Sequence, residues 1–220
     1  MKWGQAMIVL VAGSHGTTGQ LLIPLLAQGG HAVRAMVRDP AQAPAVAALG
    51  GEPLIADLEA DCAHAAKGCD AIMFSAGAGA GSGTARKETV DYAGAVKLID
   101  AAKAHGARRY VMLSAISAEN PESYDGDSDS MRAYIIAKSK ADEVLRASGL
   151  DYTIVRPGVL TDEPPTGRVE IAPIMDHSGT ITRADVAAVM ATTLELGNSI
   201  GKTFDLLAGE TPIREALLAL

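Results

Sequence analysis

The stretch GSHGTTG, residues 13–19, decides the fold, because it places three glycines at every third position between two contrasting segments. The apolar run MIVLVA, residues 7–12, precedes it and is typical of a buried strand. The segment QLLIPLLAQGGH, residues 20–31, follows it with helical periodicity. A strand, a glycine turn and a helix in this order predict either a plain tight turn or a turn whose backbone N–H groups hold phosphate.

Short β-branched runs alternate with longer helical segments along the rest of the chain, which is typical of a parallel sheet wrapped by crossover helices. We expect strands at residues 7–12, 33–37, 53–56, 71–75, 109–114, 152–156 and 203–207. We expect helices at residues 18–28, 44–49, 60–66, 88–105, 132–148 and 183–196, with Asp91 and Lys97 on a solvated helix face. Helix ends are expected at Gly29, Gly30, Gly68 and Gly149, and a helix start at Thr182 and Asp185.

These elements predict the fold class, which is an α/β, Rossmann-like doubly wound parallel sheet. We expect one domain over residues 1–220, with a small C-terminal lobe on the substrate side. No internal repeat or linker indicates a second domain.

Composition and charge restrict the class of protein. The 220 residues are 48% hydrophobic, which suffices for a substantial core. No apolar run approaches the roughly 18 to 20 residues of a membrane span, and the start MKWGQAM lacks the apolar run of a signal peptide. We therefore expect a cytoplasmic protein without a membrane partner. A net charge of −7 argues against nucleic acid. We expect a small-molecule substrate and a monomer or homodimer.

Metal chemistry is not expected. Cys62 and Cys69 lack metal-ligand spacing, and we assign them to packing. Three alternate aspartates within residues 119–130 briefly resemble a calcium loop, but the required glycine and the acidic residue at the twelfth position are absent. We interpret residues 119–130 as a solvated, mobile flap.

The glycine turn has the strand before it and the helix after it that a dinucleotide site requires. Gly13 permits the tight turn, Gly16 lets the backbone approach a pyrophosphate, and Gly19 lets the helix pack closely. The free N–H groups and the dipole at the helix start attract phosphate. The other turn residues complete the cofactor site, with hydroxyls from Thr17 and Thr18, a loop-shaping or cofactor-contacting His15, and Ser14.

The end of the second strand distinguishes the two nicotinamide cofactors. Arg38 falls there, about twenty residues after Gly19, and its planar guanidinium suits a ribose 2′-phosphate. Arg34 adds positive charge. These residues favour NADP, with NAD as the alternative if Asp39 takes the ribose or pairs with Arg38.

A candidate catalytic pair lies further along the chain. Tyr134 and Lys138 stand four residues apart on a predicted helix, so both side chains emerge on one face. A nearby ammonium stabilises a phenolate and lowers its pKa, which prepares tyrosine to exchange a proton with substrate. Ser114 closes a strand at the carboxyl edge of the sheet, where its hydroxyl can hold a substrate carbonyl.

These motifs together resemble the atypical short-chain dehydrogenase/reductase family. The resemblance rests on GSHGTTG, VRDP (37–40), ADL (56–58), LSA (113–115), YIIAK (134–138) and VRPG (155–158), and continues through FDLLAGETPIREAL near the C-terminus. More narrowly, the chain resembles the small NAD(P)-binding members called NAD-dependent epimerase/dehydratase or NmrA-like.

The resemblance also implies further cofactor contacts. It implies that the adenine contacts fall to Asp57 and Leu58, the ribose and nicotinamide contacts to Ser75, Ala76 and Gly77, and further nicotinamide contacts to Pro157, Gly158 and Val159. It matches Tyr134, Lys138 and Ser114 to the family's catalytic residues, and Lys138 also to a nicotinamide ribose contact. One departure concerns the serine: twenty residues separate Ser114 from Tyr134, more than in the standard short-chain enzymes.

Three functions follow as alternatives. The first is an NADP-dependent oxidoreductase that moves hydride between nicotinamide and a small carbonyl or alcohol. An epimerase or dehydratase is a variant with the same residues, although little chain follows Val155 to build a nucleotide-sugar pocket. The second is a non-enzymatic, NmrA-like sensor of the dinucleotide. The third is a scaffold that binds no dinucleotide.

Overall fold

Seven parallel strands form the centre of the sheet, in the order β3-β2-β1-β4-β5-β6-β10. The computed structural model describes residues 5–79 and 81–220. The strands are β1 (Ile8–Ala12), β2 (Ala32–Val37), β3 (Gly51–Ile55), β4 (Ala71–Phe74), β5 (Arg109–Leu113), β6 (Asp151–Pro157) and β10 (Lys202–Ala208). All seven were predicted within two residues at each end, because buried parallel strands read as short apolar runs. The Rossmann-like α/β fold class is confirmed.

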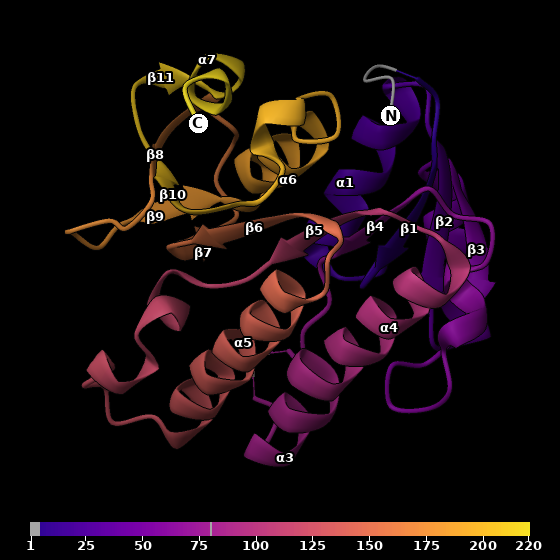
Figure 1. The fold of residues 1–220 in the computed structure, drawn as a ribbon, viewed down its shortest axis with the longest axis horizontal. Coiled ribbons are helices and arrows are strands. Elements are labelled where there is room, and N and C mark those ends of the chain that lie inside the picture. Colours follow the sequence, from indigo (N-terminus) through magenta and orange to yellow (C-terminus); the bar gives the residue numbers. More distant parts are fainter. Residues whose placement is uncertain (1–4, 80) are drawn as a thin grey trace.

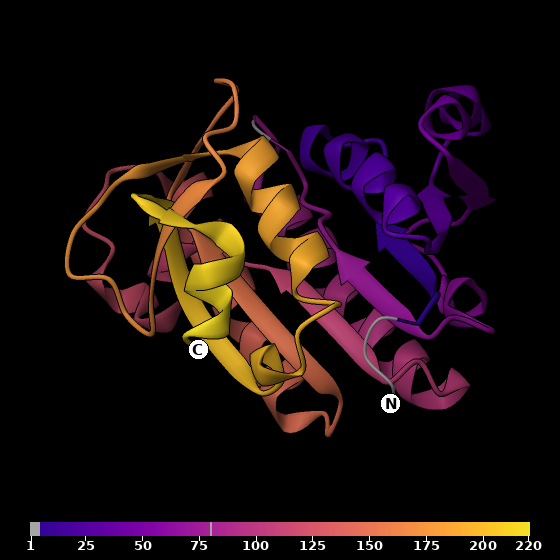
Figure 2. The same ribbon diagram turned by 90° about the horizontal axis from the view of Figure 1, so that it is seen from above.

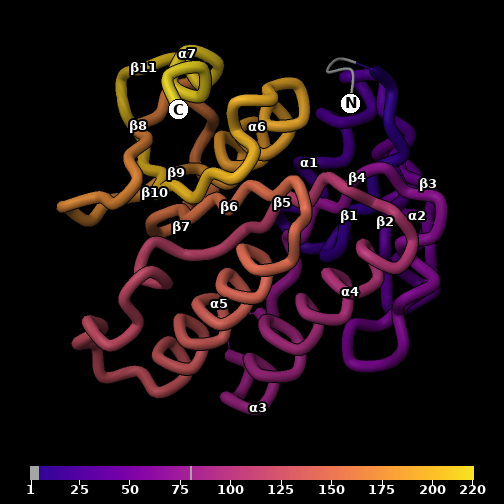
Figure 3. Tube along the Cα trace, viewed as in Figure 1, coloured from indigo at the N-terminus to yellow at the C-terminus, as the bar shows by residue number. Residues whose placement is uncertain are grey.

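Four short strands complete the C-terminal part and were not predicted. β8 (Arg168–Ala172) pairs antiparallel with β10, and β11 (Thr211–Pro212) pairs with β8 at the end of the sheet. β7 (Val159–Thr161) and β9 (Thr180–Thr182) form a separate two-stranded sheet. Figure 3 shows this part beside β10, at the side of the molecule opposite β3. Each outer strand of the large sheet contains a proline, Pro53 in β3 and Pro212 in β11.

Helices cover both faces of the sheet (Figure 1). α1 (Thr17–Gln28) and α6 (Arg183–Thr192) lie side by side on one face, as Figure 2 shows from above. α4 (Ala95–His105) and α5 (Asp129–Ala147) cover the other. β1 serves both layers, because Val9 and Val11 belong to the core cluster of the first face and Leu10 and Ala12 to that of the second.

Two predicted helices differ from the structure. Residues 60–66 contain only a 3₁₀ turn, Ala63–Ala66. The predicted helix 88–105 is divided into a π-helical segment, Lys87–Gly94, and α4. Gly94 belongs to the wide segment, and a Cβ there would lie 2.9 Å from the Leu58 side chain, so the glycine admits the loop after β3.

The other predicted helices are confirmed, and several ends were located correctly. α2 (Ala43–Ala48) corresponds to the helix predicted at residues 44–49, whereas α3 (Thr84–Arg86) and α7 (Ile213–Leu218) were not predicted. Gly30 and Gly149 follow their helices with φ of +81° and +76°, the left-handed conformation that glycine adopts readily. Thr182 caps α6, since its hydroxyl accepts a hydrogen bond from the Asp185 N–H at 2.9 Å.

The structure also bears on the cysteines, on metal-ligating side chains and on membrane-spanning helices. Cys62 and Cys69 are buried, free thiols, and burial raises the pKa of both, as packing residues require. Across residues 5–79 and 81–220, three or more metal-ligating side chains never gather in one place. Within that part of the chain, no helix is both long and apolar enough to span a membrane.

Arg109 joins segments that are far apart in the chain. Its buried guanidinium donates to the Asp151 carbonyl at 2.7 Å, the Thr193 carbonyl at 3.1 Å and the Ser199 hydroxyl at 3.1 Å. Burial lowers its pKa to about 10, against the opposing charge of Asp151. The amino end of β5 is thereby tied to β6 and to the chain after α6.

We predict that Arg109→Leu lowers the free energy of unfolding by about 3 kcal/mol, because buried carbonyls lose their donors. Arg108→Ala is the matched control. Arg108 is 60% exposed and pairs with Asp151 at the surface, so its loss costs less than about 1 kcal/mol. Urea denaturation of both variants measures the difference, and similar costs would contradict the assignment.

Candidate functional site

Steric constraints fix the glycine turn. Gly13 has φ of +83°, and a Cβ there would lie 2.6 Å from the Ala76 backbone. A Cβ at Gly19 would lie 2.2 Å from the Gly13 carbonyl oxygen. Gly19 therefore permits close approach between α1 and the turn itself. Around Gly16 there is more room, since the Gly13 oxygen at 3.2 Å is the only near contact a Cβ would make.

The amino end of α1 is open to an anion. Its N-cap residue, Gly16, provides no side-chain hydrogen bond, and the first turn contains no acidic residue. The first N–H groups of a helix have no intrahelical acceptor, and the helix dipole is positive at this end. Phosphate is the ligand that such a helix start binds best.

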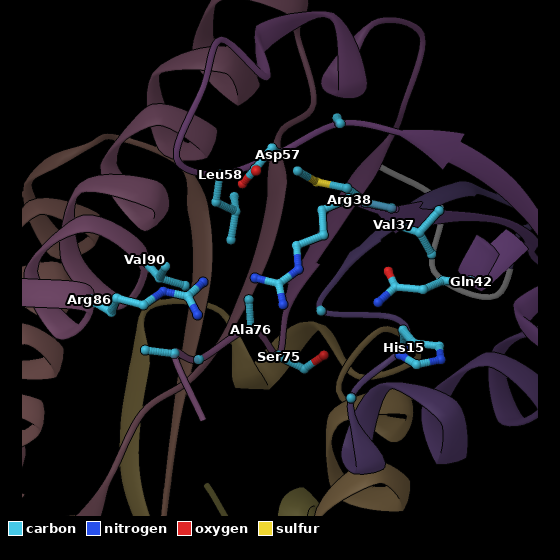
Figure 4. A pocket seen from close by; sticks show the side chains of 16 residues that line it. His15, Val37, Arg38, Gln42, Asp57, Leu58, Ser75, Ala76, Arg86 and Val90 are labelled. Carbon is cyan, nitrogen blue, oxygen red and sulfur yellow. The ribbon is translucent and has the colours of Figure 1, made fainter. Parts of the chain in front are cut away.

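A cleft of about 240 Å³ opens at this turn (Figure 4). Nine residues predicted to bind the cofactor line it: Gly13, His15, Gly16, Arg38, Asp57, Leu58, Ser75, Ala76 and Gly77. They come from the turn and from the loops after β2, β3 and β4, which all end at one edge of the sheet. The lining also includes residues that were not predicted: Met36, Val37, Gln42, Ala56, Ala78, Arg86 and Val90.

The remaining predicted cofactor residues lie outside the lining of this cleft. The buried Ser14 hydroxyl donates to the Met36 carbonyl at 2.6 Å and so joins the turn to β2. Thr17 is exposed at the helix start, whereas Thr18 and Gly19 are buried. Pro157, Gly158 and Val159 follow one another at the carboxyl end of β6, and a Cβ at Gly158 would lie 2.4 Å from Leu207.

Arg38 points into the cleft, as Figure 4 shows. Among the described residues Asp39 forms no ion pair with Arg38; its carboxylate accepts the Ala41 N–H at 2.9 Å and caps a 3₁₀ turn. Arg34 lies outside the cleft lining, and its guanidinium donates to the Lys67 carbonyl at 2.6 Å. Side chains four residues apart share a face only while both belong to one strand. Arg38 lies beyond the end of β2, so it does not share the face of Arg34.

Tyr134 and Lys138 lie together on α5, as predicted. The Lys138 ammonium is 5.8 Å from the centre of the Tyr134 ring. It donates to the Leu113 carbonyl at 2.9 Å and to the carbonyl of Ala76, a cleft residue, at 3.3 Å. Lys138 therefore adjoins the wall of the cleft.

The pKa expected for Tyr134 is corrected. Burial, and then the negative charges of Asp91 and Asp142, raise the pKa of this phenol well above its usual value. Burial lowers the pKa of the neighbouring Lys138 ammonium, and the charges of Asp91 and Asp142 oppose that fall. Tyr134 is consequently a protonated phenol at neutral pH, which is the form of a proton donor.

Ser114 is engaged inside the protein. Its buried hydroxyl donates to Asp142 at 2.9 Å, and the same carboxylate oxygen accepts the Arg156 guanidinium N–H at 2.9 Å. Asp142 follows Lys138 by four residues on α5, so extending the Tyr–Lys spacing by one turn indicates it. Burial raises the pKa of Asp142, and Arg156 and Ser114 oppose that rise.

Asp91 and Lys97 do not lie on a solvated face, contrary to expectation. Asp91 is fully buried, with one carboxylate oxygen accepting the Ala78 N–H at 3.1 Å and the other 3.8 Å from the Lys138 ammonium. Lys97 donates to the Leu58 carbonyl at 2.8 Å. The π-helical segment before α4 changes which residues face the sheet, and helical periodicity does not predict that change.

The segment 119–130 was interpreted as a free flap, yet its first residue is anchored. Glu119 forms ion pairs with the buried Arg156 and, at 3.0 Å, with Arg146 of α5. Hydrogen bonding to Arg156 holds the pKa of Glu119 below its usual value, although partial burial opposes this. One end of the segment is thus tied to β6 and α5.

Known proteins resemble this chain in sequence and in fold. Residues 13–196 match the model of the NAD(P)H-binding family. A protein of Bacillus subtilis named as an uncharacterized sugar epimerase is 43% identical over 218 residues, covering 97% of this chain and 100% of that protein.

Two solved structures are also similar. One, from Bacillus halodurans, is described as a proposed NAD-dependent epimerase/dehydratase; it has a TM-score of 0.94 and 39% identity and covers 98% of this chain and 100% of its own. The other, an oxidoreductase from Lactococcus lactis, has a TM-score of 0.86 and 33% identity over 97% of this chain and 96% of its own.

We predict that Glu119→Gln destabilises the fold at pH 7 by about 1 kcal/mol. The folded pKa of Glu119 is lowered, so its ion pairs stabilise the protein above about pH 4.5, and this contribution is lost as pH falls through the folded pKa. The difference from the natural protein should therefore narrow below pH 4.5 in urea denaturation. Glu122→Gln, on the same segment, serves as the control. A difference independent of pH would contradict the ion-pair assignment.

Proposed function

This chain belongs to the NAD(P)H-binding family, and from that premise we propose that it is an NADP-dependent oxidoreductase that transfers hydride between nicotinamide and a small carbonyl or alcohol. The observation that carries the proposal is that the candidate catalytic lysine contacts the wall of the candidate cofactor cleft. The glycine turn and Arg38 line the same cleft as Ala76, whose carbonyl accepts a hydrogen bond from Lys138.

The residues of the cleft suit a phosphorylated dinucleotide. The open amino end of α1 binds the diphosphate through backbone N–H groups, and Arg38 binds the adenosine 2′-phosphate. Asp57 and Leu58, which line the cleft, would contact the adenine, and Ser75, Ala76 and Gly77 would contact the ribose and nicotinamide. Pro157, Gly158 and Val159 complete the nicotinamide side from the end of β6.

Tyr134 provides the proton. A bound reduced nicotinamide would supply the hydride, and the Tyr134 hydroxyl would donate its proton to the carbonyl oxygen of the substrate. The Tyr134 ring lies beside the Lys138 ammonium, 5.8 Å from the ring centre, which places the phenol next to the lysine that contacts the cleft wall. Lys138 holds the phenol in place and supports the ribose.

Ser114 acts through Asp142 in this proposal. Its hydroxyl donates a hydrogen bond to the Asp142 carboxylate, which also accepts a hydrogen bond from the Arg156 guanidinium. The serine thereby fixes the α5 helix, with Tyr134 and Lys138, against the carboxyl ends of β5 and β6. This is a positioning role, and it replaces direct contact with the substrate oxygen.

An epimerase acting on a nucleotide sugar is less well supported by the geometry. Residues between β6 and α6 would have to form the sugar pocket. Eleven of the 25 residues from 158 to 182 already lie in β7, β8 and β9, which pair with each other or with β10. Because similar proteins carry epimerase names, epimerised products should also be assayed.

A dinucleotide sensor is the second candidate function, favoured by one observation. Lys138 and Ser114 both donate their hydrogen bonds to protein groups and not toward a substrate. This is expected of a site that binds a dinucleotide without catalysing a reaction. NADPH oxidation against carbonyls, quinones and flavins separates the two functions. A sensor gives no turnover but distinguishes NADP⁺ from NADPH in binding affinity.

We predict that Tyr134→Phe reduces carbonyl reduction at least about 100-fold, because the proton donor is lost. NADPH affinity should change less than about twofold, as measured by calorimetry. Tyr152→Phe, at the amino end of β6, is the control and should retain both properties. Full turnover by Tyr134→Phe would reject the catalytic assignment.

We predict that Arg38→Ala weakens NADPH binding at least about tenfold, since a charge-assisted hydrogen bond to phosphate is lost. NADH has no 2′-phosphate, and its affinity should stay within about twofold. Calorimetric titration of both cofactors measures the ratio. An equal loss for the two cofactors would show that Arg38 does not select between them.

A further inference from the structure

Arg86 enters the cleft from the wall opposite Arg38. It ends α3, after the glycine-rich loop that follows β4, and belongs to the cleft lining. Figure 4 shows the guanidinium groups of Arg38 and Arg86 pointing toward the same space from two sides. Sequence spacing does not predict this arrangement, because only the path of the loop brings residue 86 to the cleft.

Glu59 holds Arg86 in this position. Its carboxylate accepts the Arg86 N–H at 2.9 Å through one oxygen and the Thr89 hydroxyl at 2.7 Å through the other. The Thr89 hydrogen bond, and then the charges of Arg86 and Arg38, hold the pKa of Glu59 below its usual value. Both guanidinium groups therefore lie within electrostatic reach of one carboxylate.

Around Arg38 and Arg86, the cleft contains more hydrogen-bond donors than side-chain acceptors. Among the described residues, Arg86 gives a hydrogen bond only to Glu59, and Arg38 gives none. Asp57 also lines the cleft, but its carboxylate accepts the Glu59 N–H at 2.9 Å. Each guanidinium has five N–H donors in a planar fork, a geometry that matches phosphate oxygens.

We propose that Arg86 and Arg38 bind the same adenosine 2′-phosphate from opposite sides of the cleft, so that Arg86 is a second determinant of NADP preference. This inference rests on the proposed function. The diphosphate is already served by the amino end of α1, whereas Arg86 lies near Leu58 and Val90, on the adenosine side. The phosphate left for Arg86 is therefore the one on the adenosine ribose.

The test compares ligands that differ by that phosphate alone. Arg86→Ala is titrated calorimetrically with NADPH against NADH, and with 2′,5′-ADP against 5′-AMP. We expect the affinity for the two 2′-phosphorylated ligands to fall at least about tenfold and that for the other two to change less than about twofold. An equal change within each pair would overturn the proposal.

Further variants separate recognition from folding. The Arg86 side chain is 39% exposed, so Arg86→Ala should remain folded, which thermal unfolding checks. Arg108→Ala, an exposed arginine in a surface ion pair, is the matched control and should bind all four ligands normally. Arg86→Lys keeps the charge but loses the planar fork, and it should recover only part of the affinity.

A double variant tests whether the two arginines share one phosphate. In Arg38→Ala/Arg86→Ala, the loss for NADPH should be smaller than the sum of the single losses, because contacts to one group are coupled. Strict additivity would overturn the shared site. If the natural protein binds neither NADPH nor NADH, the proposed function itself fails; if it binds NADPH and Arg86→Ala keeps the NADPH/NADH ratio, only the Arg86 assignment fails.

Discussion

Backbone N–H groups at the start of α1 have no side chain to accept their hydrogen bonds, and the rest of the cleft is arranged around that fact. Gly13 and Gly19 can have no side chains, since a Cβ at either would strike backbone atoms at 2.6 Å or 2.2 Å. The loops after β2, β3 and β4 end at the same edge of the sheet and enclose the helix start. An uncapped helix costs stability unless an anion satisfies it, so fold and ligand are coupled here.

The second constraint is the charge buried along α5. Lys138 and Asp142 lie one turn apart, facing Asp91 and Arg156 from neighbouring elements. Removing such groups from water is unfavourable, and only their mutual pairing makes it tolerable. These charges also set the electrostatic environment of Tyr134, because Asp91 and Asp142 add to the effect of burial in raising the pKa of its phenol.

Local patterns in the sequence predicted the seven central strands and the glycine turn, because buried strands and glycine spacing are properties of neighbouring residues. The Tyr134–Lys138 pair followed from helical spacing. Asp91 was misjudged because a π-helical segment rotated it into the interior. Arg86 and the Ser114–Asp142 contact depend on segments that meet only in three dimensions. Short strands such as β8 form because β10 offers a partner, and their own residues carry little signal.

The two outermost strands of the large sheet share one feature, a proline in each. Proline has no N–H to donate, so β3 and β11 cannot offer an uninterrupted row of donors to a neighbouring molecule. Growth of the sheet by adding a strand from another chain is disfavoured at both ends, which protects a nine-stranded sheet against aggregation.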